Sequence, residues 1–142
     1  MRLSLWLVAL TFSTTIFACP EVNDTFVCEN ETLAISHRVE GGVNIYRFDN
    51  GDQAYDAYAD GRVHRLPNDD TMRDSTFRLE CRSSRAIDMI MEGTLLDNGA
   101  PLGSFALNQN YSRDENGDLV IVTTGEILGQ PIDQQTETCV RQ

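Results

Sequence analysis

Short turn motifs, spaced as in consecutive hairpins, constrain the fold of this chain more than any other feature. There are five of them: Gly41-Gly42, Asp49-Asn50-Gly51, Asp60-Gly61, Asp97-Asn98-Gly99 and Glu115-Asn116-Gly117. Glycine, asparagine and aspartate tolerate the positive φ angles that tight hairpin turns require. The chain is therefore expected to run back and forth in short antiparallel strands.

The segments between the turns alternate between apolar and polar residues, as half-buried strands do. Leu33, Ile35, His37 and Val39 share one face of their segment, and Phe77, Leu79 and Cys81 share one face of another. The pattern predicts ten strands, at residues 24–29, 32–40, 43–48, 53–58, 62–66, 76–82, 86–95, 102–112, 118–127 and 135–140. No segment has a convincing helical period, and residues 68–75 are expected to form a loop.

Ten strands joined mostly by short turns form a meander, and a meander of this length must curl to hide its edges. The sequence therefore predicts an all-β protein, an antiparallel up-and-down barrel of about eight to ten strands that is closed or nearly closed. A two-sheet β-sandwich is the alternative, although it would need longer crossing connections. No repeat or second domain is visible, so residues 19–142 are expected to form one domain.

The first 18 residues have the pattern of a secretory signal peptide. Arg2 precedes the apolar run Leu3–Leu10, and the small residue Ala18 stands at the expected cleavage point. Polar residues from Thr11 to Thr15 interrupt the apolar stretch before it reaches the roughly 18 residues that a membrane span needs. The mature chain, residues 19–142, is thus expected to be exported to the periplasm or the extracellular space.

The cysteine count agrees with export. Cys19, Cys28, Cys81 and Cys139 all lie in the mature chain, and an even number in an oxidising compartment indicates two disulfides. Three pairings are possible. Cys19–Cys28 with Cys81–Cys139 is the favoured one, because it closes a short N-terminal loop and ties the C-terminal strand to the middle of the domain. A lipid anchor on Cys19 is the less favoured alternative, since it would leave an odd number of cysteines.

Charge and composition exclude several classes of function. The chain has 22 acidic residues against 11 basic ones, and removal of residues 1–18 takes away one arginine and leaves a formal charge of −12. Such a protein repels nucleic acids and anionic lipid surfaces. All the basic residues are arginines, so Schiff-base chemistry and P-loop phosphate binding, which need lysine, are excluded. No cofactor or metal site is predicted, and the protein is expected to be a monomer.

The sequence resembles one known class of proteins in its architecture. A signal peptide, a Cys19-Pro20 start, a second cysteine at Cys28 in the first strand and a following β-meander are similar to small exported bacterial barrels of the lipocalin/calycin type. The lipocalin Gly-x-Trp signature is absent, because the corresponding region reads Asn23-Asp24-Thr25-Phe26. The resemblance covers the architecture of the mature chain and implies a barrel fold.

Three function classes compete. In the first, the lumen binds a small apolar molecule through residues on the inward faces of the strands, namely His37, Phe77, Leu79, Met89, Met91 and Phe105. In the second, the barrel is solid and acts through its acidic surface, as an inhibitor, as an envelope protein or against a basic protein partner. A hydrolase that uses the Asp69, Asp70 and Asp74 loop or His37 is the least favoured interpretation, because no recognised catalytic motif is present.

Overall fold

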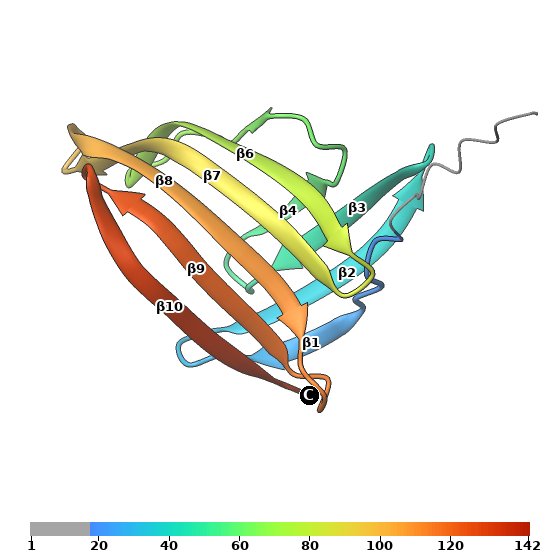
Figure 1. Cartoon of the computed structure of the whole chain (residues 1–142). Coiled ribbons are helices and arrows are strands. Elements are labelled where there is room, and N and C mark those ends of the chain that lie inside the picture. Colours follow the sequence, from blue (N-terminus) through green and yellow to red (C-terminus); the bar gives the residue numbers. More distant parts are fainter. Residues whose placement is uncertain (1–17) are drawn as a thin grey trace, which may run out of the picture.

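The structure is a computed structural model in which residues 18–142 are described, and these residues form ten strands and no helix (Figure 1). The predicted signal peptide thus lies almost wholly outside the described residues. Within them there is no helix that could span a membrane. The strands are β1 (Asp24–Val27), β2 (Thr32–Glu40), β3 (Val43–Asp49), β4 (Ala54–Tyr58), β5 (His64–Arg65), β6 (Met72–Ser83), β7 (Ala86–Asp97), β8 (Ala100–Arg113), β9 (Leu119–Ile127) and β10 (Gln130–Arg141).

All ten strands belong to one antiparallel sheet in the order β4-β3-β2-β1-β10-β9-β8-β7-β6-β5. The sheet curls through 316°, so the predicted up-and-down barrel is confirmed as a nearly closed one. The first and last strands meet in the middle of the sheet, where Phe26 pairs with Arg141 and Val27 with Val140. In Figure 1, β6–β8 arch over β2–β4, and β9 and β10 run down beside them toward β1.

The open seam lies between the consecutive strands β4 and β5, and aromatic rings cover it. The His64 ring stacks on Tyr58 on one side and on Phe77 on the other, with centroid distances of 5.5 and 5.4 Å. Tyr55 of β4 meets Phe77 of β6 edge to face at 6.5 Å. Side chains therefore bridge the two edges that backbone hydrogen bonds leave apart.

The strand boundaries differ from the predicted ones mainly around the open seam and at β10, which begins at Gln130 and not at the predicted residue 135. The strand predicted at residues 62–66 shrinks to His64–Arg65, and β6 begins at Met72 instead of residue 76. The predicted loop over residues 68–75 is therefore wrong for its second half. Asp69 closes the turn before β6, since its Oδ1 accepts hydrogen bonds from the backbone amides of Thr71 and Met72 at 2.7 and 2.8 Å.

Inward-facing side chains fill the middle of the barrel. Phe26, Tyr46, Leu79 and Met89 are each no more than 1% exposed, and they belong to one cluster to which every strand except β5 contributes. The alternation noted in the sequence produces this core, because residues two apart along a strand face the same side. These side chains pack the centre of the lumen.

The two disulfides differ from the favoured pairing. Cys19 is bonded to Cys81, and Cys28 to Cys139, over separations of 62 and 111 residues. The predicted Cys19–Cys28 and Cys81–Cys139 pairs are wrong because β1 pairs with β10. That contact brings Cys28 next to Cys139, with 4.2 Å between their Cα atoms. Two disulfides are typical of proteins in an oxidising, extracytoplasmic environment.

Candidate functional site

Two pockets open at opposite ends of the barrel. The first lies beside the β1–β2 and β3–β4 turns, and the second beside the β6–β7 and β8–β9 turns. Their volumes are about 650 and 750 Å³, within the usual range for small-molecule sites. Tyr111 lines both pockets, and its ring belongs to the packed core between them.

The second pocket, which we call the amphipathic pocket, has an apolar floor and a charged rim. Val22, Ile35, Ile87 and Leu119 form the floor, and each is at most 5% exposed. The rim carries charges of both signs, from Glu21, Arg85, Arg113, Asp114 and Glu115. A cavity with an apolar base and a few polar groups at its mouth suits a molecule with an apolar body and a polar end.

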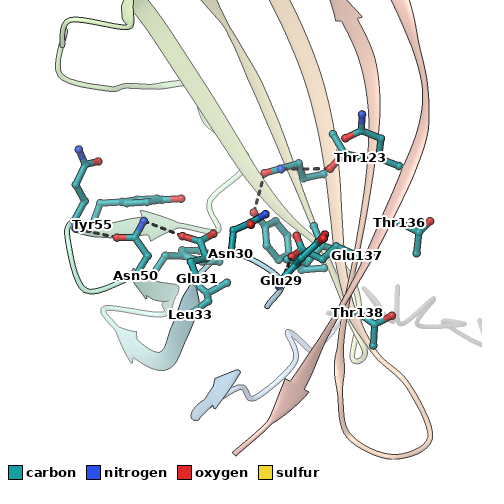
Figure 2. Close-up of a pocket in the computed structure, with 16 residues that line it drawn as sticks. Glu29, Asn30, Glu31, Leu33, Asn50, Tyr55, Thr123, Thr136, Glu137 and Thr138 are labelled. Carbon is teal, nitrogen blue, oxygen red and sulfur yellow. Dashed lines mark hydrogen bonds between the residues drawn. The ribbon is translucent and has the colours of Figure 1, made fainter. Parts of the chain in front are cut away.

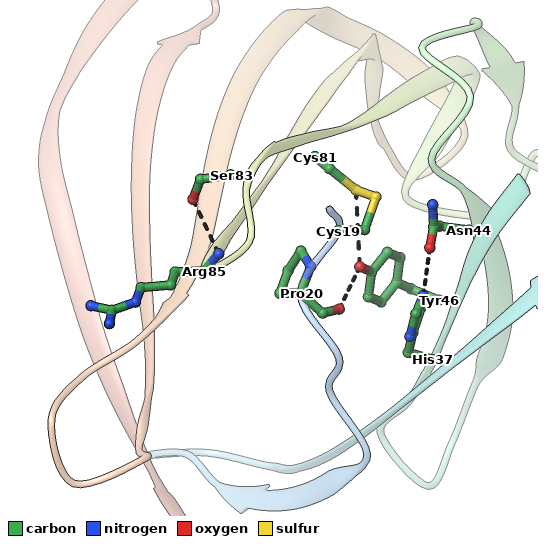
Figure 3. Close-up of a disulfide and its surroundings, with 8 residues drawn as sticks. All are labelled: Cys19, Pro20, His37, Asn44, Tyr46, Cys81, Ser83 and Arg85. Carbon is green, nitrogen blue, oxygen red and sulfur yellow. Dashed lines mark hydrogen bonds between the residues drawn. A yellow bond between two sulfur atoms is a disulfide. The ribbon is translucent and has the colours of Figure 1, made fainter. Parts of the chain in front are cut away.

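An irregular N-terminal segment, residues 19–23, contributes Pro20, Glu21 and Val22 to the lining of the amphipathic pocket. The Cys19–Cys81 disulfide attaches it to the end of β6, and the Tyr46 hydroxyl donates a hydrogen bond to the Pro20 carbonyl at 2.7 Å (Figure 3). Burial raises the pKa of Tyr46, so the phenol stays protonated and remains a donor. The segment is held at this end of the barrel although it belongs to no strand.

A cluster of charges next to the same pocket joins β1 to the C-terminal half of the sheet. The Asp24 carboxylate accepts hydrogen bonds from Arg113 of β8 and, at 3.0 Å, from Nε of Arg141 on β10. The Arg113 guanidinium also lies over the Phe26 ring, 5.6 Å from its centroid. Burial raises the pKa of Asp24, but the hydrogen bonds and charges of both arginines outweigh it and hold that pKa below its usual value.

The first pocket, which we call the acidic cleft, is polar (Figure 2). Three carboxylates line it, those of Glu29, Glu31 and Glu137, and none of the 16 described residues that line it is basic. The remaining lining residues are amides, threonines and a few apolar or aromatic groups, namely Asn30, Leu33, Phe48, Asn50, Gln53, Tyr55, Gln109, Tyr111, Ile121, Thr123, Gln135, Thr136 and Thr138. The cleft is therefore unsuited to anions.

Hydrogen bonds order the polar groups of the acidic cleft. Asn50 Nδ2 donates to Glu31 at 3.1 Å, and the Tyr111 hydroxyl donates to Gln109 Oε1 at 2.8 Å. Burial, together with the nearby charge of Glu31, raises the pKa values of Tyr55 and Tyr111. Both phenols therefore remain neutral in a cleft whose potential is negative.

The residues predicted from the sequence to bind a ligand lie mainly in the core. Phe77, Leu79 and Met89 are at most 5% exposed, and Met91 packs against the same cluster. Phe105 is also buried and lines a smaller hollow of about 270 Å³ near the β7–β8 hairpin. None of these residues lines either of the two large pockets. Their predicted role in ligand binding remains a prediction.

His37, the other predicted ligand residue, has partners inside the protein. Its Nε2 atom lies 2.8 Å from Asn44 Oδ1, and its ring stacks on Tyr46 with 4.8 Å between centroids. A half-buried imidazole with an internal hydrogen bond needs no ligand to satisfy it.

The only group of possible metal ligands found in the described residues is Cys28, Glu137 and Cys139. Both sulfur atoms belong to one disulfide, so neither is the thiolate that a metal would require. The arrangement is a bridged strand pair and not a metal centre.

Sequence reasoning missed most of the residues around the two pockets. The floor residues Ile35, Ile87 and Leu119 fall in predicted strands, but nothing in their alternation distinguishes a pocket floor from a solid core. The walls come from turns and from the N-terminal segment, whose positions depend on how the sheet closes. The link between Asp24, Arg113 and Arg141 likewise depends on the contact between β1 and β10.

Comparisons with protein-family models, with curated proteins and with solved structures find no match to this chain. The geometry of the two pockets is therefore the basis for assigning a function.

Proposed function

We propose that the protein is an exported binding protein that holds a small amphipathic molecule in the amphipathic pocket. The observation that carries this proposal is the pocket of about 750 Å³ whose floor consists of four buried aliphatic residues. Burial of apolar ligand surface on such a floor supplies most of the affinity of a small-molecule site. The resemblance to lipocalin/calycin barrels favours the same class of function.

The charged rim of the pocket is the reason to expect a ligand with a polar end. Arg85 lies at the mouth, and no ion pair within residues 18–142 includes it. Glu21 and Glu115 offer acceptors on other parts of the rim. A polar group of the ligand can therefore stay near water at the mouth while the apolar body covers Ile35 and Ile87.

This proposal places the ligand at one end of the lumen and not in its centre. Core residues such as Leu79 and Met89 occupy the centre, and a ligand there would have to displace them. Close-packed interiors resist such displacement, because even one additional methylene group strains neighbouring side chains.

A variant that fills the pocket tests the proposal. We expect Val22→Phe to weaken binding of the fluorescent fatty acid cis-parinaric acid by about tenfold or more, because the larger ring occupies the space of the ligand body. Val22 lies in the irregular N-terminal segment, so the backbone there can adjust to the larger ring without breaking strand pairs. Probe fluorescence, titrated against folded protein, measures the effect.

Val63→Phe is the matched control, since Val63 is 66% exposed and lines neither end pocket. This control should bind the probe as the unmodified protein does. Equal probe binding by Val22→Phe and Val63→Phe, with both variants folded by circular dichroism, would show that the amphipathic pocket is not the binding site.

A further inference from the structure

A long part of β10 has no neighbouring strand on one side. Within the described chain, β10 pairs with β1 only at Val140 and Arg141, whereas it pairs with β9 along nearly its whole length. The β1 chain lies beside β10 as far as the Cys28–Cys139 disulfide and then turns away toward β2. The edge of β10 from Gln130 to Thr138 is left open, and nearly all of this stretch is exposed.

The open edge has one straight part that can accept another strand. A bulge between Ile132 and Gln135 distorts the far part of the edge, and Pro131 has no amide hydrogen to donate. Such features protect edges against unwanted pairing. Residues Gln135–Thr138 pair regularly with β9, so this shorter stretch keeps the geometry of an ordinary strand.

The hydrogen bonds to β1 show which backbone groups face the open side. The Gln142 amide donates to the Thr25 carbonyl at 2.9 Å, so the backbone groups of Gln142 point toward β1. Backbone groups alternate in direction along a strand, and those of Val140, Thr138 and Thr136 therefore point the same way. Val140 pairs with β1, but Thr136 and Thr138 have no β1 residue opposite them.

The acidic cleft lies directly along this edge. Residues Gln135–Thr138 form one wall, and Glu29 and Glu31 of the β1–β2 turn stand on the other. The Glu29 amide donates to the Glu137 carboxylate at 3.1 Å, a contact between the two walls. In Figure 2 the side chains of Thr136 and Thr138 point away from the cleft, while Glu137 points into it.

We propose that an extended, basic segment of a partner protein docks in the acidic cleft as an additional strand on β10. Its backbone pairs with Thr136 and Thr138, as in other cases of strand addition to a free sheet edge. Its lysine or arginine side chains, at every second position, face Glu31 and Glu137. Charge complementarity selects the partner, since no described residue lining the cleft is basic and residues 19–142 carry a charge of −12.

A pair of synthetic peptides tests the requirement for charge. The probe is a capped hexapeptide of alternating lysine and valine, and the matched control alternates glutamate and valine. We expect only the lysine peptide to bind and to shift the backbone amide resonances of Thr136 and Thr138. Binding of both peptides with similar affinity, or of neither, would overturn the proposal.

Thr136→Pro tests the requirement for strand pairing. Proline removes an amide hydrogen that points to the open side, and edge strands tolerate proline at such a position. The variant should fold normally by circular dichroism and lose about tenfold or more in affinity for the lysine peptide. A lysine peptide that is N-methylated on its pairing amides should lose affinity for the unmodified protein to a similar extent. Unchanged affinity in both experiments would mean that charge alone attracts the peptide. Pairing of the peptide with β10 as an additional strand would then be excluded.

Two carboxylate variants separate the local charge of the cleft from the net charge of the protein. Glu31→Gln with Glu137→Gln keeps the acceptors for Asn50 and Glu29 but removes both charges. This double variant should weaken binding far more than Glu21→Gln with Glu115→Gln, which removes two charges at the opposite end. Equal weakening would contradict a specific site.

The oligomeric state of the protein tests the other possible occupant of the edge. If the protein forms a dimer in solution and Thr136→Pro abolishes it, a second copy of this chain, and not a basic partner, occupies the edge.

Discussion

The double replacement Cys28→Ser with Cys139→Ser is expected to lower the free energy of unfolding by about 4 kcal/mol. The bond spans 111 residues, and a cross-link over a longer loop restricts the unfolded chain more strongly. It also sits where β1 meets β10, a contact that includes only two registered residue pairs. Urea unfolding under non-reducing conditions measures the loss.

Cys19→Ser with Cys81→Ser is the control for this prediction. That bond spans 62 residues, but it attaches only the irregular segment at residues 19–23 to β6. Its loss should cost less, because the native chain regains the freedom of that segment while all the strand pairs remain. Equal costs for the two double variants, or a disulfide-linked Cys19–Cys28 peptide in a non-reducing digest, would contradict a Cys28–Cys139 bond that closes the sheet.

The fold was largely predictable because its signals are local. The Gly41-Gly42 and Asn98-Gly99 pairs both adopt positive φ, as their predicted hairpin turns require, and strands β2, β3 and β8 lie close to their predicted positions. Period-two alternation places Ile35, Leu79 and Ile87 on the apolar faces of their strands, and all three are buried. The number of strands and their sequential order followed from these two signals.

The disulfide pairing and the pockets were not predictable, because they depend on contacts between distant parts of the chain. Cys28 lies nine residues from Cys19 but pairs with Cys139, since the sheet closes through β1 and β10. The acidic cleft exists because β10 is longer than the strand beside it. No local pattern in residues 130–141 indicates that their neighbour ends at Val27.

The second large loss of stability is expected on substitution of Asp24. Asp24→Asn should lower the free energy of unfolding by about 2 kcal/mol, because two guanidinium groups lose the carboxylate between them. The Asp24 side chain is only 16% exposed and contacts Arg113 of β8 and Arg141 of β10. Since β1 has just two registered pairs with β10, this ion cluster adds to the few contacts that close the sheet there. Thermal and urea unfolding at neutral pH measure the cost.

Asp56→Asn is the matched control for Asp24→Asn. Asp56 also contacts two arginines, Arg38 at 2.8 Å and Arg47 at 3.4 Å, but in the regular pairing of β2, β3 and β4. Those arginines are 40% and 48% exposed, so solvent screens the pair and the substitution should cost about 1 kcal/mol or less. A cost for Asp56→Asn as large as that for Asp24→Asn would show that closure of the sheet does not depend on the Asp24 cluster.

Acidification should remove the difference in free energy of unfolding between the unmodified protein and Asp24→Asn. The pKa of Asp24 is lowered in the folded state, so its contribution is complete above the unfolded value of about 4 and disappears as the pH falls through the folded value. The difference in unfolding free energy between the unmodified protein and Asp24→Asn should therefore stay constant from about pH 7 to pH 5 and shrink below about pH 4. Other carboxylates with lowered pKa values, among them Asp56 and Asp60, titrate in both proteins and cancel in this difference. A difference that stays constant down to the lowest pH at which both proteins fold would mean that the charge of Asp24 does not hold β1 against β8 and β10.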